Sequence, residues 1–298
     1  MTMSEADVTI IGAGPAGVAA AIQLKRSGIS PLLVEKERVG GLVKNACRVE
    51  NYPGFPGGIS GLQLADLLAT HLAGAGVDVL FEEVVRLDHD GRCFSVETGQ
   101  RRRRSRIVML ATGTKPRKYN DLYIPAGAAP YIHTEIYPIR DCTGKRIAIV
   151  GAGDAAFDYA LNLAENNDIV ILNRSEETRC LPLLRKRAEQ TPRIALWSRA
   201  AIESVSEAVP EGLLLSCRLP GQSISLPVQY LILAIGREPQ RDFLPETFSM
   251  GADTLKGEGM LYEIGDIRNG SFRQVAIAVG DGIRAAMSVA EQWQGKRV

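Results

Sequence analysis

The chain has 298 residues and a net charge of +1 at pH 7, because 35 Lys and Arg nearly balance 34 Asp and Glu. A balanced charge gives no overall field that would favour nucleic acid or a membrane surface. No apolar run reaches the roughly 18 residues of a membrane-spanning helix. The length predicts about two domains. The N-terminus, Met1–Asp7, is acidic and unlike a signal peptide, so we expect a cytoplasmic protein.

The cysteine pattern argues against a disulfide framework and against a metal site. The chain has 5 cysteines and 3 histidines, all widely spaced and none in a Cys-x-x-Cys arrangement. The cysteines are Cys47, Cys93, Cys142, Cys180 and Cys217.

A β-branched stretch from Val8 to Ile11 leads into Gly12-Ala13-Gly14-Pro15-Ala16-Gly17, and an apolar helical pattern follows. Gly-x-Gly-x-x-Gly between a strand and a helix is typical of dinucleotide-binding loops. The first glycine permits the tight turn, the second lets backbone approach a pyrophosphate, and the third lets the helix pack on the strand. A second strand, Pro31 to Val34, ends at Glu35, where a carboxylate would accept hydrogen bonds from a ribose.

The next segments complete a first Rossmann unit. Residues 51–57 are rich in Gly and Pro, which predicts a shaped loop. The other elements expected here are a helix over 61–72, strands over 77–81, 84–87, 93–97 and 107–110, and a loop at Ala111-Thr112-Gly113-Thr114.

The pattern then restarts. A strand over 146–150 leads into Gly151-Ala152-Gly153-Asp154-Ala155-Ala156, a second glycine-rich loop at the start of a helix. Two such units in tandem predict one flavin and one nicotinamide nucleotide. The remaining elements expected are a helix to about residue 166, a strand over 168–172, a helix over 183–189, a hairpin region over 201–226, a strand over 230–235 and a last helix over about 280–294.

We therefore predict an α/β fold with two Rossmann-like, three-layer nucleotide-binding domains. One domain, residues 115–239, is inserted into the other, whose two parts are residues 1–114 and 240–298.

Several motifs together resemble those of the thioredoxin-reductase-like flavoproteins, over nearly the whole chain. They are the two glycine loops, Gly40-Gly41, Glu50-Asn51-Tyr52-Pro53-Gly54-Phe55, Ala111-Thr112-Gly113, Gly265-Asp266 and Arg273-Gln274. The resemblance implies FAD in the split domain, NAD(P)H in the inserted domain and a homodimer.

Carried over by position, the resemblance implies two sets of contacts. Those for FAD are Gly12, Gly14, Pro15, Ala16, Glu35, Lys36, Gly41, Leu42, Asn51, Val84, Ala111, Thr112, Gly113, Gly265, Asp266, Arg273, Gln274 and Val275. Those for NADPH are Gly151, Gly153, Asp154, Ala155, Asn173, Arg174, Arg179 and Gly236. The hydride and electron chemistry belongs to the cofactors, so we predict no catalytic acid, base, nucleophile or metal ligand.

The chain departs from thioredoxin reductases at their redox dithiol. The family's Cys-x-x-Cys-Asp would fall on Thr134, Tyr137 and Pro138, none of which matches. A dithiol relay needs an attacking and a resolving thiol. We interpret the nearby Cys142 as a buried structural thiol. Members without the dithiol resemble ferredoxin/flavodoxin–NADP reductases of the thioredoxin-reductase type. Those enzymes usually carry a C-terminal extension that lays an aromatic ring on the flavin, and we expect no such extension here after the last helix.

The nicotinamide site departs from the family as well. NADPH-specific relatives carry His-Arg-Arg-x-x-x-Arg after the second strand, and this chain has Asn173-Arg174-Ser175 and Arg179. Two of three arginines remain to bind a 2′-phosphate, and no acid ends the strand, so we favour NADPH over NADH. The alternative is that nicotinamide does not bind at all, as in some members that take electrons from ferredoxin.

The sequence says least about the electron acceptor. A basic run, Arg101 to Arg104 with Arg106, is placed at a hairpin turn and is either a solvated surface or a docking site for an acidic carrier such as ferredoxin or flavodoxin. Lacking interleaved aromatics, it does not indicate nucleic-acid binding. We predict an FAD-dependent NAD(P)H oxidoreductase with ferredoxin or flavodoxin as acceptor. The alternatives are a small-molecule acceptor (quinone, disulfide or oxygen) and a flavin electron-transfer protein that does not use NAD(P)H.

Overall fold

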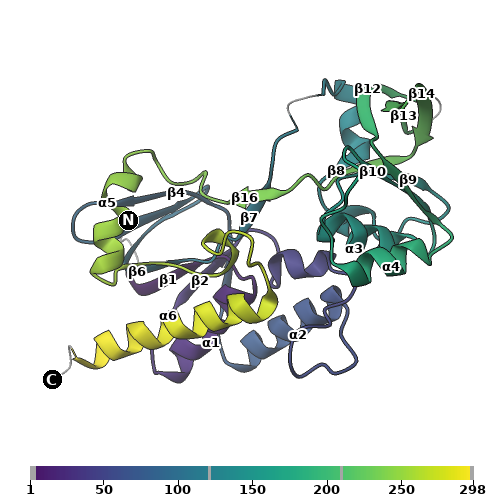
Figure 1. The fold of residues 1–298 in the computed structure, drawn as a ribbon. Helices are drawn as coiled ribbons and strands as arrows, with labels where there is room; N and C mark the ends of the chain where they lie inside the picture. The colour runs from purple at the N-terminus through teal and green to yellow at the C-terminus, as the bar shows by residue number, and fades with distance from the viewer. Residues whose placement is uncertain (1–4, 120–121, 209–210, 296–298) are drawn as a thin grey trace. The chain divides into compact units, whose positions relative to one another are not determined.

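A computed structural model describes residues 5–119, 122–208 and 211–295 (Figure 1). Met1–Ser4, the start of the N-terminal segment considered above, lies outside these residues. The chain divides into two compact units, which we describe separately. Unit 1 consists of Met1–Lys44, Val49–Lys115 and Glu238–Val298, and unit 2 of Asn45–Arg48 and Pro116–Arg237.

Unit 1 is built on a seven-stranded sheet in the order β3-β2-β1-β6-β5-β4, with β17 also paired to β6. β1, β2, β3, β6 and β17 run parallel, whereas β4 and β5 form an antiparallel hairpin on β6. The strands are β1 (Glu5–Ile11), β2 (Leu32–Glu35), β3 (Val79–Phe81), β4 (Val84–His89), β5 (Phe94–Thr98), β6 (Arg102–Leu110) and β17 (Leu261–Glu263). The parallel strands end at one edge of the sheet, where a Rossmann fold binds its ligand.

The two faces of this sheet are covered differently because side chains alternate along each strand. Val8 and Ile10 pack with residues of α1 (Pro15–Arg26), α2 (Gly61–Gly74) and α6 (Val275–Gly295). Ile11 on the opposite face packs with residues of the β4–β5 hairpin and of α5 (Phe248–Gly257).

Helices α1 and α6 pack closely through small side chains. A Cβ at Gly282 would overlap the backbone of Ala16 and lie 3.1 Å from the nitrogen of Ala20. Ala278, Ala285 and other α6 residues complete the same buried cluster. This contact places Gly282, about two turns into α6, beside the N-terminal turn of α1.

Unit 2 has three layers. Its parallel sheet, in the order β11-β10-β9-β15-β8, has α3 and α4 packed on one face and a three-stranded antiparallel sheet, β12-β13-β14, on the other. The elements are β8 (Ile132–His133), β9 (Arg146–Val150), α3 (Asp154–Leu163), β10 (Asp168–Asn173), α4 (Pro182–Glu189), β11 (Ile194–Ser198), β12 (Ala201–Glu207), β13 (Leu213–Leu219), β14 (Gln222–Val228) and β15 (Tyr230–Leu233). Where the chain passes between the units, β7 (Thr114–Pro116) pairs with β16 (Arg237–Pro239).

Most predicted elements are present, with three differences. Of the arginine run, only Arg101 lies in the turn, where its carbonyl accepts from the N–H of Thr98, and the rest lies in β6, which begins at Arg102. The hairpin region contains three strands, and the last helix begins at Val275, five residues before Gly280. No helix among the described residues is long and apolar enough to cross a lipid bilayer.

Candidate functional site

The first glycine loop has the shape that its sequence predicts. Gly12 has a φ of +103°, and a Cβ there would lie 2.5 Å from the carbonyl oxygen of Ala111, so the position requires glycine. A Cβ at Gly14, in contrast, would meet no protein atom within 4 Å. Pro15 begins α1 at its first position, where a missing N–H has no cost. The loop is therefore open beside the free N–H groups of a helix N-terminus, which suits a pyrophosphate.

Glu35 is fixed at the end of β2 by its own hydrogen bonds. One carboxylate oxygen accepts from the backbone N–H of Ala13 at 2.7 Å, and the other accepts from that of Glu37 at 3.0 Å. The residue is 9% exposed. A buried carboxylate bound to the glycine loop stands where the ribose acid of a dinucleotide-binding fold is expected.

Two further predicted glycines approach the same loop from distant parts of the chain. A Cβ at Gly41 would lie 3.3 Å from the Cα of Gly14. Gly265 has a φ of +73°, and a Cβ there would lie 2.9 Å from the Cβ of Ala16. Three segments of unit 1 thus meet at the N-terminus of α1, and the space that they leave is consistent with a nucleotide.

The remaining predicted flavin contacts lie in several segments of unit 1. Asn51 donates its amide N–H to the side-chain oxygen of Gln274 at 2.7 Å, although 223 residues separate them. Thr112 donates its hydroxyl to the carbonyl of Gln240 at 2.8 Å. Ala111 and Gly113 flank Thr112, Lys36 and Leu42 follow β2, Val84 begins β4, Asp266 lies in a 3₁₀ turn after β17, and Arg273 directly precedes Gln274 and Val275.

A carboxylate that the sequence analysis missed holds the Gly265–Asp266 turn in place. Asp281 on α6 is 6% exposed and accepts from the backbone N–H of Gly265 at 3.2 Å, from the amide of Asn269 at 2.7 Å and from Arg284 at 2.7 Å. No local motif marks Asp281, because the partners that it holds in the turn, Gly265 and Asn269, lie in a different segment. It is a positioning residue for the turn that carries Asp266.

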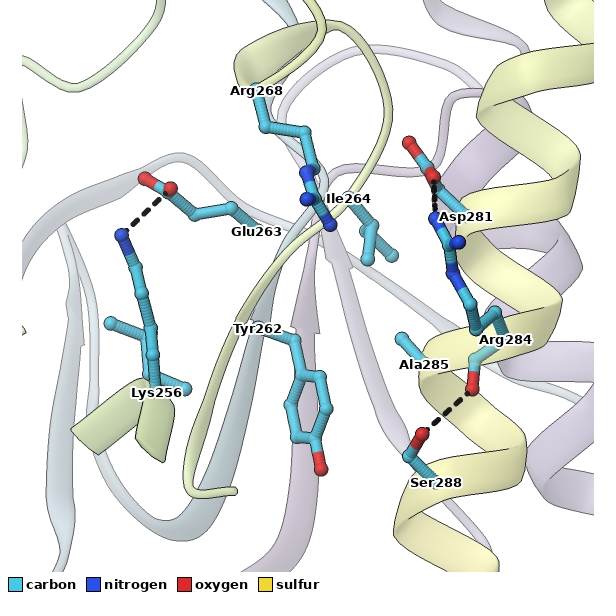
Figure 2. Close-up of a pocket in the computed structure, with 10 residues that line it drawn as sticks. Lys256, Tyr262, Glu263, Ile264, Arg268, Asp281, Arg284, Ala285 and Ser288 are labelled. Atoms are coloured by element: carbon cyan, nitrogen blue, oxygen red, sulfur yellow. Dashed lines mark hydrogen bonds and ion pairs between the residues drawn. The ribbon is translucent and has the colours of Figure 1, made fainter. Parts of the chain in front are cut away.

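Figure 2 shows the cavity beside this carboxylate, between β17, α5 and α6. It measures about 390 Å³ and is lined by none of the residues predicted to bind nucleotide. Two ion pairs line it: Lys256 with Glu263 at 2.9 Å, and Arg284 with Asp281 on the same helix, α6. The cavity therefore lies next to the candidate flavin site without forming part of it.

Replacing Asp281 with leucine is expected to destabilise the protein by about 3 kcal/mol, because the buried N–H of Gly265 and the amide of Asn269 lose their acceptor. Urea unfolding measures this loss. Asp281→Asn keeps an acceptor oxygen and is expected to lose less than half as much. A leucine variant within 0.5 kcal/mol of the wild type, roughly the scatter of surface changes, would contradict the role of Asp281.

The second glycine loop, in unit 2, follows the same design. A Cβ at Gly153 would meet no protein atom within 4 Å, and Asp154 begins α3. The Asp154 carboxylate accepts from the backbone N–H of Leu181 at 2.7 Å, and the N–H of Arg179 donates to the carbonyl of Ala152 at 2.8 Å. The segment that carries Arg179 is thereby anchored to the glycine loop.

The other predicted nicotinamide contacts lie at the end of β10, at the second glycine loop and at Gly236. Asn173, at the end of β10, is 4% exposed, and its side chain bonds within its own loop, to Ser175 and to the carbonyl of Glu177. Its amide thus shapes the loop. Arg174 is exposed and has no charged partner among the described residues. Gly151 and Ala155 lie at the glycine loop, and Gly236 lies near the side chain of Arg117.

All 5 cysteines are free thiols. Burial raises the pKa of Cys47 to about 11, with Asp158 adding to the shift, and burial also raises the pKa of Cys142. Cys142 lies at the entrance to β9, where Asn167 bonds its thiol and its carbonyl oxygen. A raised pKa keeps a thiol protonated at neutral pH and makes it a poor nucleophile.

The arginine run is largely neutralised by neighbouring acids. In β6, Arg102 pairs with Glu97 at 3.0 Å and Arg104 with Asp90 at 2.8 Å. Before the strand, Arg101 pairs with Glu82 at 3.2 Å. These pairs leave little free positive charge on the run for an acidic partner.

The Pyridine nucleotide-disulphide oxidoreductase family model matches residues 6–282. The chain belongs to this family. It is 29% identical to a thioredoxin reductase of Treponema pallidum (strain Nichols), over 95% of this chain and 96% of that protein. The structure resembles Lactococcus lactis thioredoxin reductase with a TM-score of 0.83 at 25% identity, covering 96% and 98% of the two chains. For T. acidophilum thioredoxin reductase the TM-score is 0.81 at 25% identity, covering 97% and 98%.

Family membership confirms three predictions: the α/β fold class with two Rossmann-like domains, the enzyme class and the cofactors. The chain is an FAD-containing, NADPH-dependent oxidoreductase of the thioredoxin-reductase-like group. The residues assigned to each nucleotide remain predictions. The contacts found here are that Gly41 and Gly265 approach the first glycine loop and that the segment of Arg179 is anchored to the second.

Proposed function

We propose that this protein passes electrons from NADPH through FAD to an acceptor outside the chain. In this proposal the cluster at Gly14, Glu35 and Gly265 holds FAD, and the loop at Gly153 and Arg179 holds NADPH. FAD, when bound, accepts a hydride from the nicotinamide and releases electrons to the next carrier. The protein contributes the phosphate-binding helix N-termini, the ribose carboxylate and the arginines.

The state of the cysteines is the observation that carries the proposal of an external acceptor. Relatives of this chain are named thioredoxin reductases, and the resemblance places their dithiol at Thr134 and Tyr137 here. The 5 cysteines of this chain are unpaired, and burial raises the pKa of Cys47 and of Cys142. A relay through two thiols of this chain is therefore disfavoured.

The acceptor we favour is a one-electron carrier protein, ferredoxin or flavodoxin, as the resemblance to dithiol-free members implies. Docking of such an acidic carrier would rely on electrostatic steering. We also keep the expectation of a homodimeric, cytoplasmic protein from the sequence.

A small-molecule acceptor, a quinone, a disulfide or oxygen, is the second candidate, and one observation favours it. Three arginines of the basic run, which was the predicted docking site, already form ion pairs with Glu82, Glu97 and Asp90. A surface that is neutral overall attracts an acidic protein weakly.

Turnover at increasing salt distinguishes the two acceptors. With NADPH as donor, ferredoxin or flavodoxin reduction is expected to fall at least fivefold between low and about 0.5 M salt, because the Debye length shrinks. Reduction of a quinone should change little. Carrier turnover that is slow at all salt concentrations, with fast quinone turnover, would favour the small-molecule acceptor.

A variant with Cys47, Cys142 and Cys180 replaced by alanine is expected to keep its acceptor turnover within twofold of the wild type. These are the three half-buried cysteines, whereas Cys93 and Cys217 are buried. Flavin reduction by NADPH in the same variant serves as the control. A loss of more than tenfold in acceptor turnover, with flavin reduction intact, would show that a thiol relays the electrons.

A further inference from the structure

Arg199 has an unusual backbone for its residue type. Its φ of +54° makes it the one non-glycine residue with positive φ in the described part of the chain. It directly follows β11, and the register pairs Ser198 with Asn173 at the end of β10. A left-handed backbone at a bulky residue persists only where its surroundings hold it, and such residues are frequent at ligand sites.

The surroundings that hold Arg199 belong to the candidate NADPH loop. Its backbone N–H donates to the carbonyl of Ser175 at 3.1 Å, and the N–H of Ala200 donates to the carbonyl of Asn173 at 2.9 Å. The guanidinium forms an ion pair with Glu176. Arg199 is therefore bound to the segment that carries Arg174 and Arg179, although no motif in the sequence connects them.

We propose that Arg199 is a specificity residue of the nicotinamide site. Its guanidinium binds the 2′-phosphate that distinguishes NADPH from NADH. This inference rests on the proposed function. In Rossmann folds the adenosine ribose lies at the end of the second strand, here β10, and an arginine there accommodates a 2′-phosphate. Arg199 supplies a guanidinium at that strand end, in addition to Arg174 and Arg179.

The carboxylate of Glu176 competes with a bound phosphate for the guanidinium of Arg199. That carboxylate and the guanidinium are both largely exposed, with side-chain exposures of 64% and 63%. An exposed ion pair of this kind is weak. A phosphate dianion offers more charge and more acceptor oxygens than a carboxylate, so it displaces Glu176 from Arg199.

The test compares two nucleotides that differ in the 2′-phosphate alone, 2′,5′-ADP and 5′-AMP, by calorimetric titration of the FAD-loaded protein. The variant is Arg199→Gly, because glycine keeps the positive φ at no steric cost and removes only the side chain. The control is Arg218→Ala, which removes an arginine of similar exposure, 68%, paired with Glu203 in the same unit. Arg199→Gly is expected to weaken 2′,5′-ADP at least tenfold and 5′-AMP less than twofold, and the control is expected to change neither.

A second variant tests the competitor. Glu176→Gln is expected to strengthen 2′,5′-ADP two- to fivefold with no effect on 5′-AMP. The inference is overturned if Arg199→Gly leaves 2′,5′-ADP unchanged, if it weakens both nucleotides equally, or if the wild type does not prefer 2′,5′-ADP. A wild type that binds neither nucleotide would instead overturn the proposed function.

Discussion

Replacing Gly14 with valine is expected to give a folded protein that does not retain FAD. The backbone of Gly14 is extended, with φ −70° and ψ −178°, which valine adopts readily, and a Cβ there meets no protein atom within 4 Å. The substitution therefore leaves the fold intact. The new side chain instead fills the space where backbone must approach the pyrophosphate, so we expect at least a 100-fold loss of FAD affinity, or about 2.7 kcal/mol.

Absorbance of the purified variant and fluorescence titration of the apoprotein with FAD measure this loss. Gly74→Val is the matched control, because Gly74 also has open space around its Cβ but ends α2. It should stay fully yellow. A stoichiometrically loaded Gly14→Val protein would show that the flavin does not use this loop.

Replacing Gly153 with valine is expected to separate the two nucleotide sites. Gly153 has the same extended backbone, φ −95° and ψ −178°, and the same open space beside a helix N-terminus. The variant should keep its FAD and lose NADPH-driven flavin reduction at least 100-fold at subsaturating NADPH, because the side chain excludes the nucleotide's phosphates. Reduction by dithionite, which needs no nucleotide site, should be unchanged. NADPH reduction within threefold of the wild type would place the nicotinamide nucleotide elsewhere.

The parts of the site that the sequence predicted are those that local structure determines. A strand, a glycine turn and a helix in succession specify the loops at Gly12 and Gly151. Both glycines have positive φ, and a Cβ at either would overlap the backbone that follows a neighbouring strand. Glu35 could be predicted for the same reason, since the distance from the glycines places it at the end of the adjacent parallel strand.

Residues whose role depends on tertiary contacts escaped prediction. Asp281 is significant because α6 packs beside the turn at Gly265, and Arg199 because β11 ends next to β10. Asn51 and Gln274 were each predicted as flavin contacts through the family resemblance, whereas the hydrogen bond between them was not predicted. The arginine run was misplaced because five arginines suggest an exposed turn. On β6, alternate side chains instead pair with acids of the neighbouring hairpin: Arg102 with Glu97 on β5, and Arg104 with Asp90 in the turn between β4 and β5.

Anaerobic mixing of the wild-type protein with NADPH and, separately, with NADH tests the central claim most directly. Loss of the oxidised-flavin absorbance at about 450 nm reports the reduction of the flavin. We predict rapid bleaching by NADPH and slower bleaching by NADH. An FAD-loaded protein that neither nucleotide bleaches would contradict the assignment of the second glycine loop to a nicotinamide donor.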